Sequence, residues 1–448
     1  MDRSTMVPRT AKGRPAAVRT SDYTLRLPPS PRRLGGELTV ADAAFRLQRF
    51  FGIHRGLMRA IAGRLMSVAE LELKIELPCH LYLHAEACRA LRDRLCELRG
   101  GSPELSPQLA DVSPLFQEVL AAPSTPDFVL ATHGVVGRSL LEAEREYIRR
   151  TDGLCDQPSV RVLSRILQDI GPAIEYGQIV VGAFEQVGYR RDDHRSWLSR
   201  VEAHLAAIGG VAGDQPRGKA PLPPPPFERP LACARDPRMT TFHEPRSSRR
   251  DEVAEKCKDE HERERLSHLR TQRDELDAVE TFANVLFDMP EAPFDFQMDL
   301  ARFIWDEARH AEIGHQALAR LGLDPFDVPC AVMGINVRAP LPPDLAFAQI
   351  STFGELPMVG PMQRFVEHAY AGGDREHAMM MDFIHSDELI HVRHGRAWLR
   401  GALSGGDLRG LEERARRAAI GRLVEEGVCT EEQVATLSAS DLGRLLGE

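Results

Sequence analysis

The chain has 448 residues, of which 43% are hydrophobic and 27% charged, and its formal net charge is −9. This length suits two or three domains, and the modest acidity argues against a general nucleic-acid or membrane-surface protein. No apolar run approaches the roughly 18 residues of a membrane span, and the beginning of the chain lacks the apolar segment of a secretory signal. The eight cysteines form no C-x-x-C pair, which argues against a zinc ribbon or a disulfide framework and favours a cytoplasmic protein.

The first part of the chain predicts an arm followed by a helical domain. Residues 1–35 are rich in Arg, Pro, Ser and Thr, which is typical of a disordered arm. Residues 36–208 place apolar residues at near-helical spacing, so we expect an all-α domain. The string His84-Ala85-Glu86 repeats the H-A-E of residues 310–312, which suggests a degenerate, metal-free duplicate of the bundle described next. The alternative is a second metal site formed by Glu70, Glu72, Glu76, His80 and His84.

The second part of the chain predicts a connector, a bundle and an appendix. Residues 209–250 are proline-rich and are expected to be extended in part, whereas residues 405–448 predict a small helical appendix. Between them, residues 251–404 predict a four-helix bundle. Its helices are expected at residues 251–288, 293–321, 345–371 and 374–403. Residues 323–343, with five prolines, would form one long crossover connection between the second and third helices.

Two similar strings lie on the second and fourth predicted helices of this bundle. Residues 306–310 read D-E-A-R-H, and residues 387–391 read D-E-L-I-H. On a helix, a Glu and a His three residues apart project from one face, about 60° apart, so each pair can hold a metal ion from one side. Two such pairs, with one further Glu from each of the other two helices, are the ligands of dinuclear iron and manganese bundles.

The spacing along the chain suggests which carboxylates complete the set. Glu280 lies 27 residues before Glu307, and Glu355 lies 33 residues before Glu388, which suits a path from one mid-helix to the next. Glu367 competes with Glu355 but is close to a predicted helix end. The predicted metal ligands are therefore Glu280, Glu307, His310, Glu355, Glu388 and His391. Glu307 and Glu388 are expected to bridge the two ions.

The surroundings of these ligands carry further expectations. Asp306 and Asp387 are expected to accept the free N–H of the ligand histidine on the facing helix, which fixes its tautomer. Pro357 and Pro361 remove backbone donors, which favours a local bulge that aims Glu355. The nearby histidines that we expect to be outer or exposed groups, not ligands, are His315, His385 and His394.

The chemistry of the set favours a dinuclear centre over ordinary surface pairs. Four carboxylates and two imidazoles suit iron or manganese, and four negative charges balance two divalent ions. The alternative is a pair of solvated helix faces with common i,i+3 pairs. It is disfavoured because the motifs stand among apolar residues, namely Phe303, Ile304, Ile384, Leu389 and Ile390.

Residues 262–403 resemble the ferritin-like di-iron carboxylate superfamily. The string at residues 306–310 matches the D-E-x-R-H of bacterial di-iron monooxygenases. The Glu355-to-Glu388 spacing and the proline-containing third helix resemble more closely a bacterial ferritin-like family catalogued as domain of unknown function 455, which is similar to the di-iron hydroxylase of a modified tRNA adenosine. The resemblance implies a ferritin-like bundle with two iron ions, or a manganese–iron pair, and O2 as co-substrate.

We therefore expect a non-haem di-iron oxidase or oxygenase that acts on a small molecule, amino acid, peptide or nucleotide held beside the centre. One alternative is a ferroxidase, metal store or peroxide scavenger, and another is a binding or scaffold protein with a structural metal. The expected partners are this substrate and an external electron donor, with no membrane; a dimer is compatible with the sequence. Net acidity argues against nucleic acid, although the resemblance keeps tRNA as an alternative.

Overall fold

The computed structural model of the chain describes residues 32, 34–244, 257, 259–434, 442 and 445. Nearly all of the predicted disordered arm lies outside these residues, as do residues 245–256 and most of the end of the predicted appendix. The described residues form an all-α protein, which confirms the predicted class. None of their helices combines the length and apolarity that crossing a membrane would require.

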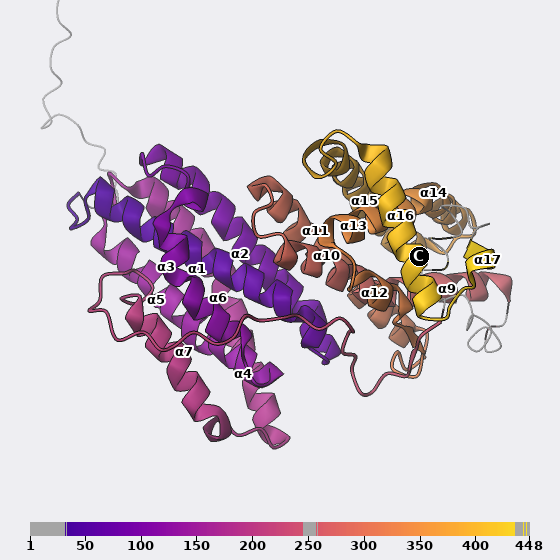
Figure 1. Cartoon of the computed structure of the whole chain (residues 1–448), viewed down its shortest axis with the longest axis horizontal. Coiled ribbons are helices and arrows are strands. Elements are labelled where there is room, and N and C mark those ends of the chain that lie inside the picture. Colours follow the sequence, from indigo (N-terminus) through magenta and orange to yellow (C-terminus); the bar gives the residue numbers. More distant parts are fainter. Residues whose placement is uncertain are drawn as a thin grey trace, which may run out of the picture.

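The N-terminal half is a helical bundle, drawn in indigo to magenta in Figure 1. Thr39 begins it with a capping box, since its side chain accepts from the backbone N–H of Asp42 while Asp42 accepts in return. Its α-helices are α1 (Val40–Arg64), α2 (Leu71–Glu97), α3 (Pro107–Leu120), α4 (Thr125–Val129), α5 (Arg138–Arg150), α6 (Gln157–Gln186) and α7 (Arg195–Ala207). A π-helical segment, η4 (Leu130–Gly137), joins α4 to α5, and short 3-10 turns lie at Leu65–Ser67, Pro103–Leu105 and Arg191–His194.

The C-terminal half contains the four predicted helices in more pieces than expected. Its helices are α9 (Glu260–Arg273), α10 (Leu276–Asp288), α11 (Phe294–Arg320), α12 (Met333–Arg338), α13 (Pro343–Gln349), α14 (Leu356–Ala371), α15 (Arg375–Trp398), α16 (Leu408–Glu425) and α17 (Glu431–Val434). Two π-helical segments, η7 (Ile350–Glu355) and η8 (Leu399–Leu403), continue α13 into α14 and extend α15. Asp374 caps α15, because its side chain accepts from the N–H of His377.

The first helix of this half differs from the prediction of one continuous helix over residues 251–288. Within the described residues it breaks between α9 and α10. Arg273 and Asp274 form an ion pair with no solvent exposure at the break, and Arg273 also donates to the carbonyls of Pro325, Val328 and Pro329 in the crossover. These contacts hold the chain in a turn at residues where helical periodicity alone predicts continuation.

The crossover is more structured than a proline-rich loop. It contains α12 and the strand β2 (Cys330–Ala331), which pairs in parallel with β1 (Thr241–Phe242) at the end of the connector. The connector itself is extended between α7 and β1 and runs along both halves (Figure 1). Its end is therefore fixed beside the break between α9 and α10.

The two halves pack directly against each other and share one apolar core. Helix α2 lies along α11, and α1 lies against α10 (Figure 1). At this contact the ring of Tyr82 stacks on Trp305 with a centroid distance of 4.9 Å, and Arg59 donates to the carbonyls of Leu286 and Phe287. The helix that carries the first D-E-x-x-H motif is thus supported from outside by the N-terminal bundle.

Candidate metal centre

Six buried or partly buried side chains from four segments converge in the C-terminal half. They form two overlapping groups, and the potential ligand atoms of each group all lie within 4.8 Å of one another. The first group is Glu275, Glu307, His310 and Glu388, and the second is Glu307, Glu355, Glu388 and His391. We call these six residues the dinuclear cluster. Five of its members are predicted ligands; the sixth, Glu275, is not.

Glu307 and Glu388 have the geometry of bridging carboxylates. Glu307 places one oxygen 3.4 Å from Nδ1 of His310 and the other 3.1 Å from Nδ1 of His391. Glu388 does the same, with distances of 3.4 Å and 3.6 Å. Each carboxylate thus serves both imidazoles, one oxygen to each side, which is the arrangement that a pair of neighbouring cations requires.

The remaining two carboxylates each belong to one side. An oxygen of Glu275 lies 3.1 Å from Nδ1 of His310, and an oxygen of Glu355 lies 3.6 Å from Nδ1 of His391. The cluster is therefore nearly symmetric: each half has one imidazole, one terminal carboxylate and a share of the two bridging ones.

The outward nitrogens of the two imidazoles face the aspartates of the opposite motifs. Nε2 of His310 donates to Asp387 at 3.3 Å, and Nε2 of His391 donates to Asp306 at 3.4 Å. Because a carboxylate only accepts, this contact places the proton on Nε2 and leaves the lone pair of Nδ1 pointing into the cluster. The contacts predicted for Asp306 and Asp387 are present, and their role behind metal-ligand histidines stays a prediction.

Two arginines fix these aspartates. Arg309 donates to Asp387 at 2.7 Å and also to Asp306, while Arg302 donates to Asp306 at 2.7 Å. The guanidinium carbons of both arginines lie 5.2 Å from the ring centroid of Trp305. Sequence reasoning identified the D-E-x-R-H string but missed that its arginine connects the two aspartates across the helices.

Glu280 does not join the cluster, so its prediction as a metal ligand is corrected. Its carboxylate is buried and forms ion pairs with Lys74 of α2 and with Arg235 of the connector, the latter at 2.8 Å to both oxygens. Burial lowers the pKa of Lys74, and the carboxylate of Glu280 acts in the opposite direction. With two cations already satisfying it, Glu280 connects the N-terminal bundle and the connector to α10.

Glu275 takes the place predicted for Glu280, and the break between α9 and α10 explains why. Five residues of continuous helix rotate a side chain by about 140°, so the two glutamates face different sides. Gly314 of α11 lets the break approach closely, since a Cβ there would lie 2.3 Å from the backbone nitrogen of Arg273. The sequence contains one signal for Glu275. Glu355 lies 33 residues before Glu388, and the same interval before Glu307 leads to residue 274, one residue before Glu275.

Glu355 is the carboxylate of the third helix, as predicted over Glu367. It is the last residue of the π-helical segment η7, which precedes Pro357 and Pro361 in the way the predicted bulge requires. Glu367 is exposed and accepts from Gln363 instead. The π-helical turn therefore ends at Glu355, the residue whose carboxylate it directs toward the cluster.

The electrostatics of the cluster call for added positive charge. Burial, with the neighbouring carboxylates, raises the pKa of Glu355 to about 7 and that of Glu275 to about 8. Burial lowers the pKa of His391, but its hydrogen bonds to Asp306 and to the glutamates raise it well above its usual value. Four carboxylates around two imidazoles thus retain protons that metal cations would displace.

The fit to two metal ions can be tested on the atoms that lack partners. Nδ1 of His310, Nδ1 of His391 and both oxygens of Glu355 are buried, and within the described residues they make only loose contacts inside the cluster, with carboxylate oxygens 3.1–3.6 Å from each Nδ1. Both ring nitrogens belong to histidines whose outward nitrogen is already satisfied. Orphaned buried polar atoms are costly, and here they all face one shared space, so the donor set fits a pair of divalent ions.

The other histidines near the motifs stay outside the cluster. His315 packs on Phe326, His394 lies 3.3 Å from Asp299, and His385 belongs to none of the potential metal groups among the described residues. The apolar surroundings are only partly as expected: Phe303, Ile304 and Ile384 are buried, whereas Leu389 and Ile390 are exposed. These last two turn outward because they stand on the face of α15 opposite to Glu388 and His391.

The alternative second metal site in the N-terminal bundle does not form within the described residues. Glu72 pairs with Arg238, and His84 hydrogen-bonds His54. His80 contacts Glu76 at 3.3 Å and hydrogen-bonds His133, but no three of the five residues come together as potential ligands.

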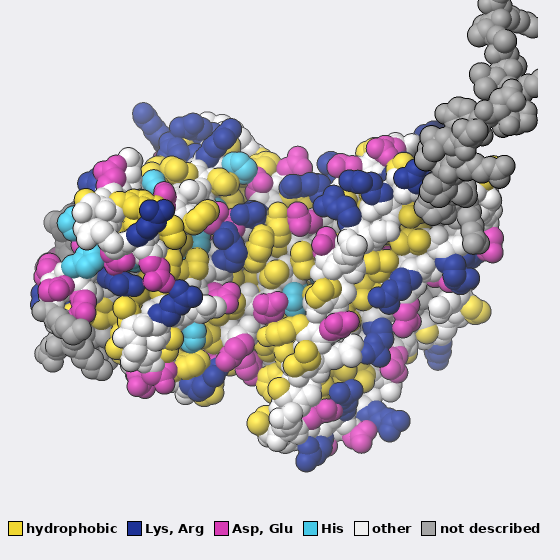
Figure 2. Space-filling view, turned by 180° about the vertical axis from the view of Figure 1, so that it is seen from behind, with side chains coloured by type: hydrophobic (Ala, Val, Ile, Leu, Met, Phe, Trp, Pro, Cys, Tyr) yellow, Lys and Arg dark blue, Asp and Glu magenta, His cyan; other side chains and the backbone are white. Residues whose placement is uncertain are grey.

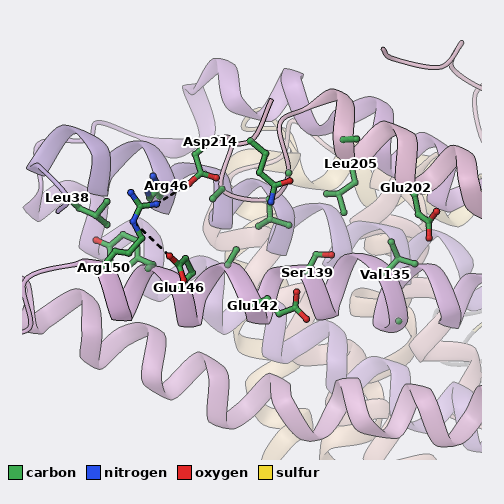
Figure 3. A pocket seen from close by; sticks show the side chains of 18 residues that line it. Leu38, Arg46, Val135, Ser139, Glu142, Glu146, Arg150, Glu202, Leu205 and Asp214 are labelled. Atoms are coloured by element: carbon green, nitrogen blue, oxygen red, sulfur yellow. Dashed lines mark hydrogen bonds and ion pairs between the residues drawn. The ribbon is translucent and has the colours of Figure 1, made fainter. Parts of the chain in front are cut away.

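A cleft of about 640 Å³ in the N-terminal bundle is drawn in Figure 3. Its walls carry Arg46, Glu146, Arg150 and Asp214, which pair with one another. None of the six cluster residues lines it. A substrate pocket beside the cluster therefore stays a prediction.

Comparison of the chain with protein-family models, with curated proteins and with solved structures gives no match.

Proposed function

We propose that the chain is a dinuclear metal oxidoreductase with a ferritin-like bundle, in which two iron ions occupy the cluster and O2 oxidises an organic substrate. One observation carries the proposal: Glu307 and Glu388 each present one oxygen to each of two imidazole Nδ1 atoms. A single metal ion, or a structural network of ion pairs, needs no such doubled arrangement. A manganese–iron pair has the same ligand preferences and remains the alternative.

When bound, the two iron ions would supply the electrons and the open positions for reducing O2. Glu275 and His310 would hold one ion, Glu355 and His391 the other, and Glu307 and Glu388 both. An oxygenase reaction would insert one oxygen atom into a C–H bond of the substrate. The second oxygen atom would leave as water, with two electrons and two protons from an external donor.

The protein's own residues support this chemistry in three ways. Asp306 and Asp387 keep the proton on Nε2 of each imidazole, so Nδ1 remains a ligand. Phe282 and Phe303 pack on the ring of His391, with centroid distances of 6.2 Å and 4.3 Å, and exclude water from that side. The π-helical segment that ends at Glu355 brings this carboxylate to the His391 side of the cluster.

The proposal is tested by adding Fe(II) to the metal-free chain without oxygen and then admitting air. We expect two tightly bound iron ions per chain, and O2 uptake that is lost in Glu307→Gln. Glu144→Gln, which alters a buried histidine–glutamate contact in the N-terminal bundle, serves as the matched control and is expected to behave as wild type. Iron binding without O2 uptake would contradict the redox role and leave a structural metal site.

Substrate dependence separates the enzyme from a ferroxidase or a metal store. An oxidase or oxygenase consumes O2 repeatedly once substrate and electron donor are present, whereas a ferroxidase stops when the added Fe(II) is exhausted. Candidate small molecules, peptides and nucleotides, with tRNA among them, can be screened by this O2 uptake.

A further inference from the structure

A third group of metal-ligand side chains lies on the surface of the C-terminal half. His261 and Glu264 project from α9, and His368 projects from α14; one ligand atom of each lies within 4.8 Å of those of the others. Nε2 of His368 is 3.8 Å from Glu264, and Nε2 of His261 is 3.3 Å from Asp374. Figure 2 shows several exposed histidine side chains at the end of the molecule that holds α9 and α14. We call His261, Glu264 and His368 the outer site.

The outer site and the dinuclear cluster are connected along the chain by α9 and the turn that follows it. His261 and His268 are seven residues apart on α9, which is nearly two turns, so they share one side of the helix about 10 Å apart. Glu275 follows seven residues later, in the turn between α9 and α10. Three metal-ligand residues at this spacing form a column that leads from the surface to the cluster.

Each step of the column is completed by the facing helices. His261 meets His368 and Asp374, His268 meets His377, and Glu275 meets His310 and Glu388. Nδ1 of His268 lies 3.2 Å from Nε2 of His377, with the two rings stacked 9° from parallel. His377 is buried, and its Nδ1 has no hydrogen-bond partner within the described part of the chain. The middle step thus offers an unused imidazole nitrogen in the interior.

Exposure falls along the column in the direction of the cluster. The side chains of His261, Glu264 and His368 are 43%, 35% and 67% exposed, which makes them accessible to ions in solution. At the inner end, Glu275 keeps 17% exposure, whereas His310 has none. The most exposed side chain of the His310 half of the cluster is therefore the one at the foot of the column.

We propose that the outer site binds a divalent transition metal ion and loads the dinuclear cluster through His268 and His377. Two imidazoles and one carboxylate are borderline donors that suit Fe(II), Co(II) and Zn(II), and three exposed ligands leave positions for water, so the ion is held exchangeably. The loading role rests on the proposed function, because it needs a metal-binding cluster to fill. The outer site itself does not.

Co(II) added to the metal-free full-length chain tests the proposal, since its visible absorption reports binding and stoichiometry without turnover. Wild type is expected to bind three ions, two tightly and one weakly. The double variant His261→Gln/His368→Gln is expected to lose the weak ion, keep the two tight ones, and fill them at least 10-fold more slowly at limiting metal. His243→Gln, which alters an exposed histidine–glutamate pair elsewhere, is the matched control and is expected to match wild type.

Two further variants separate the steps. His268→Phe is expected to retain the weak ion while slowing the filling of the tight sites, and Glu307→Gln to retain the weak ion alone. Unchanged stoichiometry and filling rate in the His261→Gln/His368→Gln variant would overturn the outer site and its loading role. Loss of the tight ions from wild type itself, with the weak ion still present, would instead refute the dinuclear function and leave the outer site standing.

Discussion

The two bundles both bury histidines in their interiors but satisfy them differently. In the N-terminal bundle, Nδ1 of His54 lies 2.8 Å from Nδ1 of His84, and Nδ1 of His80 lies 3.0 Å from Nε2 of His133. One buried carboxylate, Glu144, contacts this group, through Nε2 of His54 at 2.9 Å. In the C-terminal bundle, each imidazole faces an aspartate on one side and several glutamates on the other.

The number of carboxylates, and not the number of histidines, distinguishes the candidate metal centre from the polar core of the N-terminal bundle. Imidazoles that bond to one another are satisfied as neutral rings, and burial lowers the pKa of His84 and of His133, the latter to about 3. Four glutamates around two imidazoles are neutralised differently, by retained protons that metal cations would displace. Both bundles contain a π-helical segment, at Leu130–Gly137 and at Ile350–Glu355, and the predicted duplication stays a prediction.

Substitution of a bridging carboxylate is expected to have the largest effect on metal content and O2 uptake. Glu307→Gln removes a ligand of both ions, so we expect loss of both from the cluster and a fall in O2 uptake of at least about 100-fold. Glu144→Gln alters the carboxylate of the N-terminal group and is expected to leave the metal content unchanged. Metal analysis of the two purified variants checks this, and equal metal contents would contradict it.

Glu275 and Glu280 are only five residues apart but are assigned different roles, Glu275 in the cluster and Glu280 in ion pairs. Glu280→Gln leaves Lys74 buried without a carboxylate and Arg235 with Asp277 alone, so we expect a fall of about 3 kcal/mol in the free energy of unfolding. The folded fraction is expected to keep two ions. Glu275→Gln is expected to do the reverse, with weaker metal binding and a smaller loss of stability. Denaturant unfolding and metal titration together decide between the two assignments.

The aspartates behind the imidazoles predict an intermediate effect. Asp306→Asn or Asp387→Asn replaces an acceptor by a group that can donate to Nε2, which weakens control of the histidine tautomer. We expect metal affinity to fall about 10- to 100-fold while the fold is kept. Affinity is measured by competition with a chelator. An affinity equal to that of wild type would show that the aspartates serve only Arg302 and Arg309.

The smallest effect concerns the N-terminal histidines and pH. Burial, with His80 beside it, lowers the pKa of His133 from 6.5 to about 3. Between these two pH values the ring is protonated in the unfolded chain and neutral in the native chain. The stability contributed by the neutral ring is complete above pH 6.5 and is lost as the pH falls toward 3. At pH 5 the loss for this one ring is on the order of 2 kcal/mol.

Unfolding of the metal-free protein at pH 7 and at pH 5 measures this dependence. His133→Gln is expected to reduce it, whereas His243→Gln is expected to preserve it. A pH dependence that His133→Gln leaves unchanged would show that His133 accepts a proton inside the folded bundle.

The sequence predicts those site residues whose positions depend on one helix, and not those that depend on contacts between distant segments. Glu307 and His310, like Glu388 and His391, are fixed by the geometry of a single helix, and so their prediction needed no tertiary information. Glu275 depends on a helix break that Arg273 and Asp274 hold through the distant crossover, which helical periodicity cannot reveal. His54 and His84, like His80 and His133, meet only in the folded bundle, so the histidine pairs of the N-terminal half could not be predicted from the sequence.

Anomalous scattering at the iron edge, from crystals of the iron-loaded protein, tests directly whether two iron ions occupy the cluster. We expect two strong peaks at the dinuclear cluster, one beside Nδ1 of His310 and one beside Nδ1 of His391, with Glu307 and Glu388 contacting both. A single peak at the cluster, or iron bound to Nε2 of either histidine, would contradict a dinuclear centre and with it the proposed oxidative role.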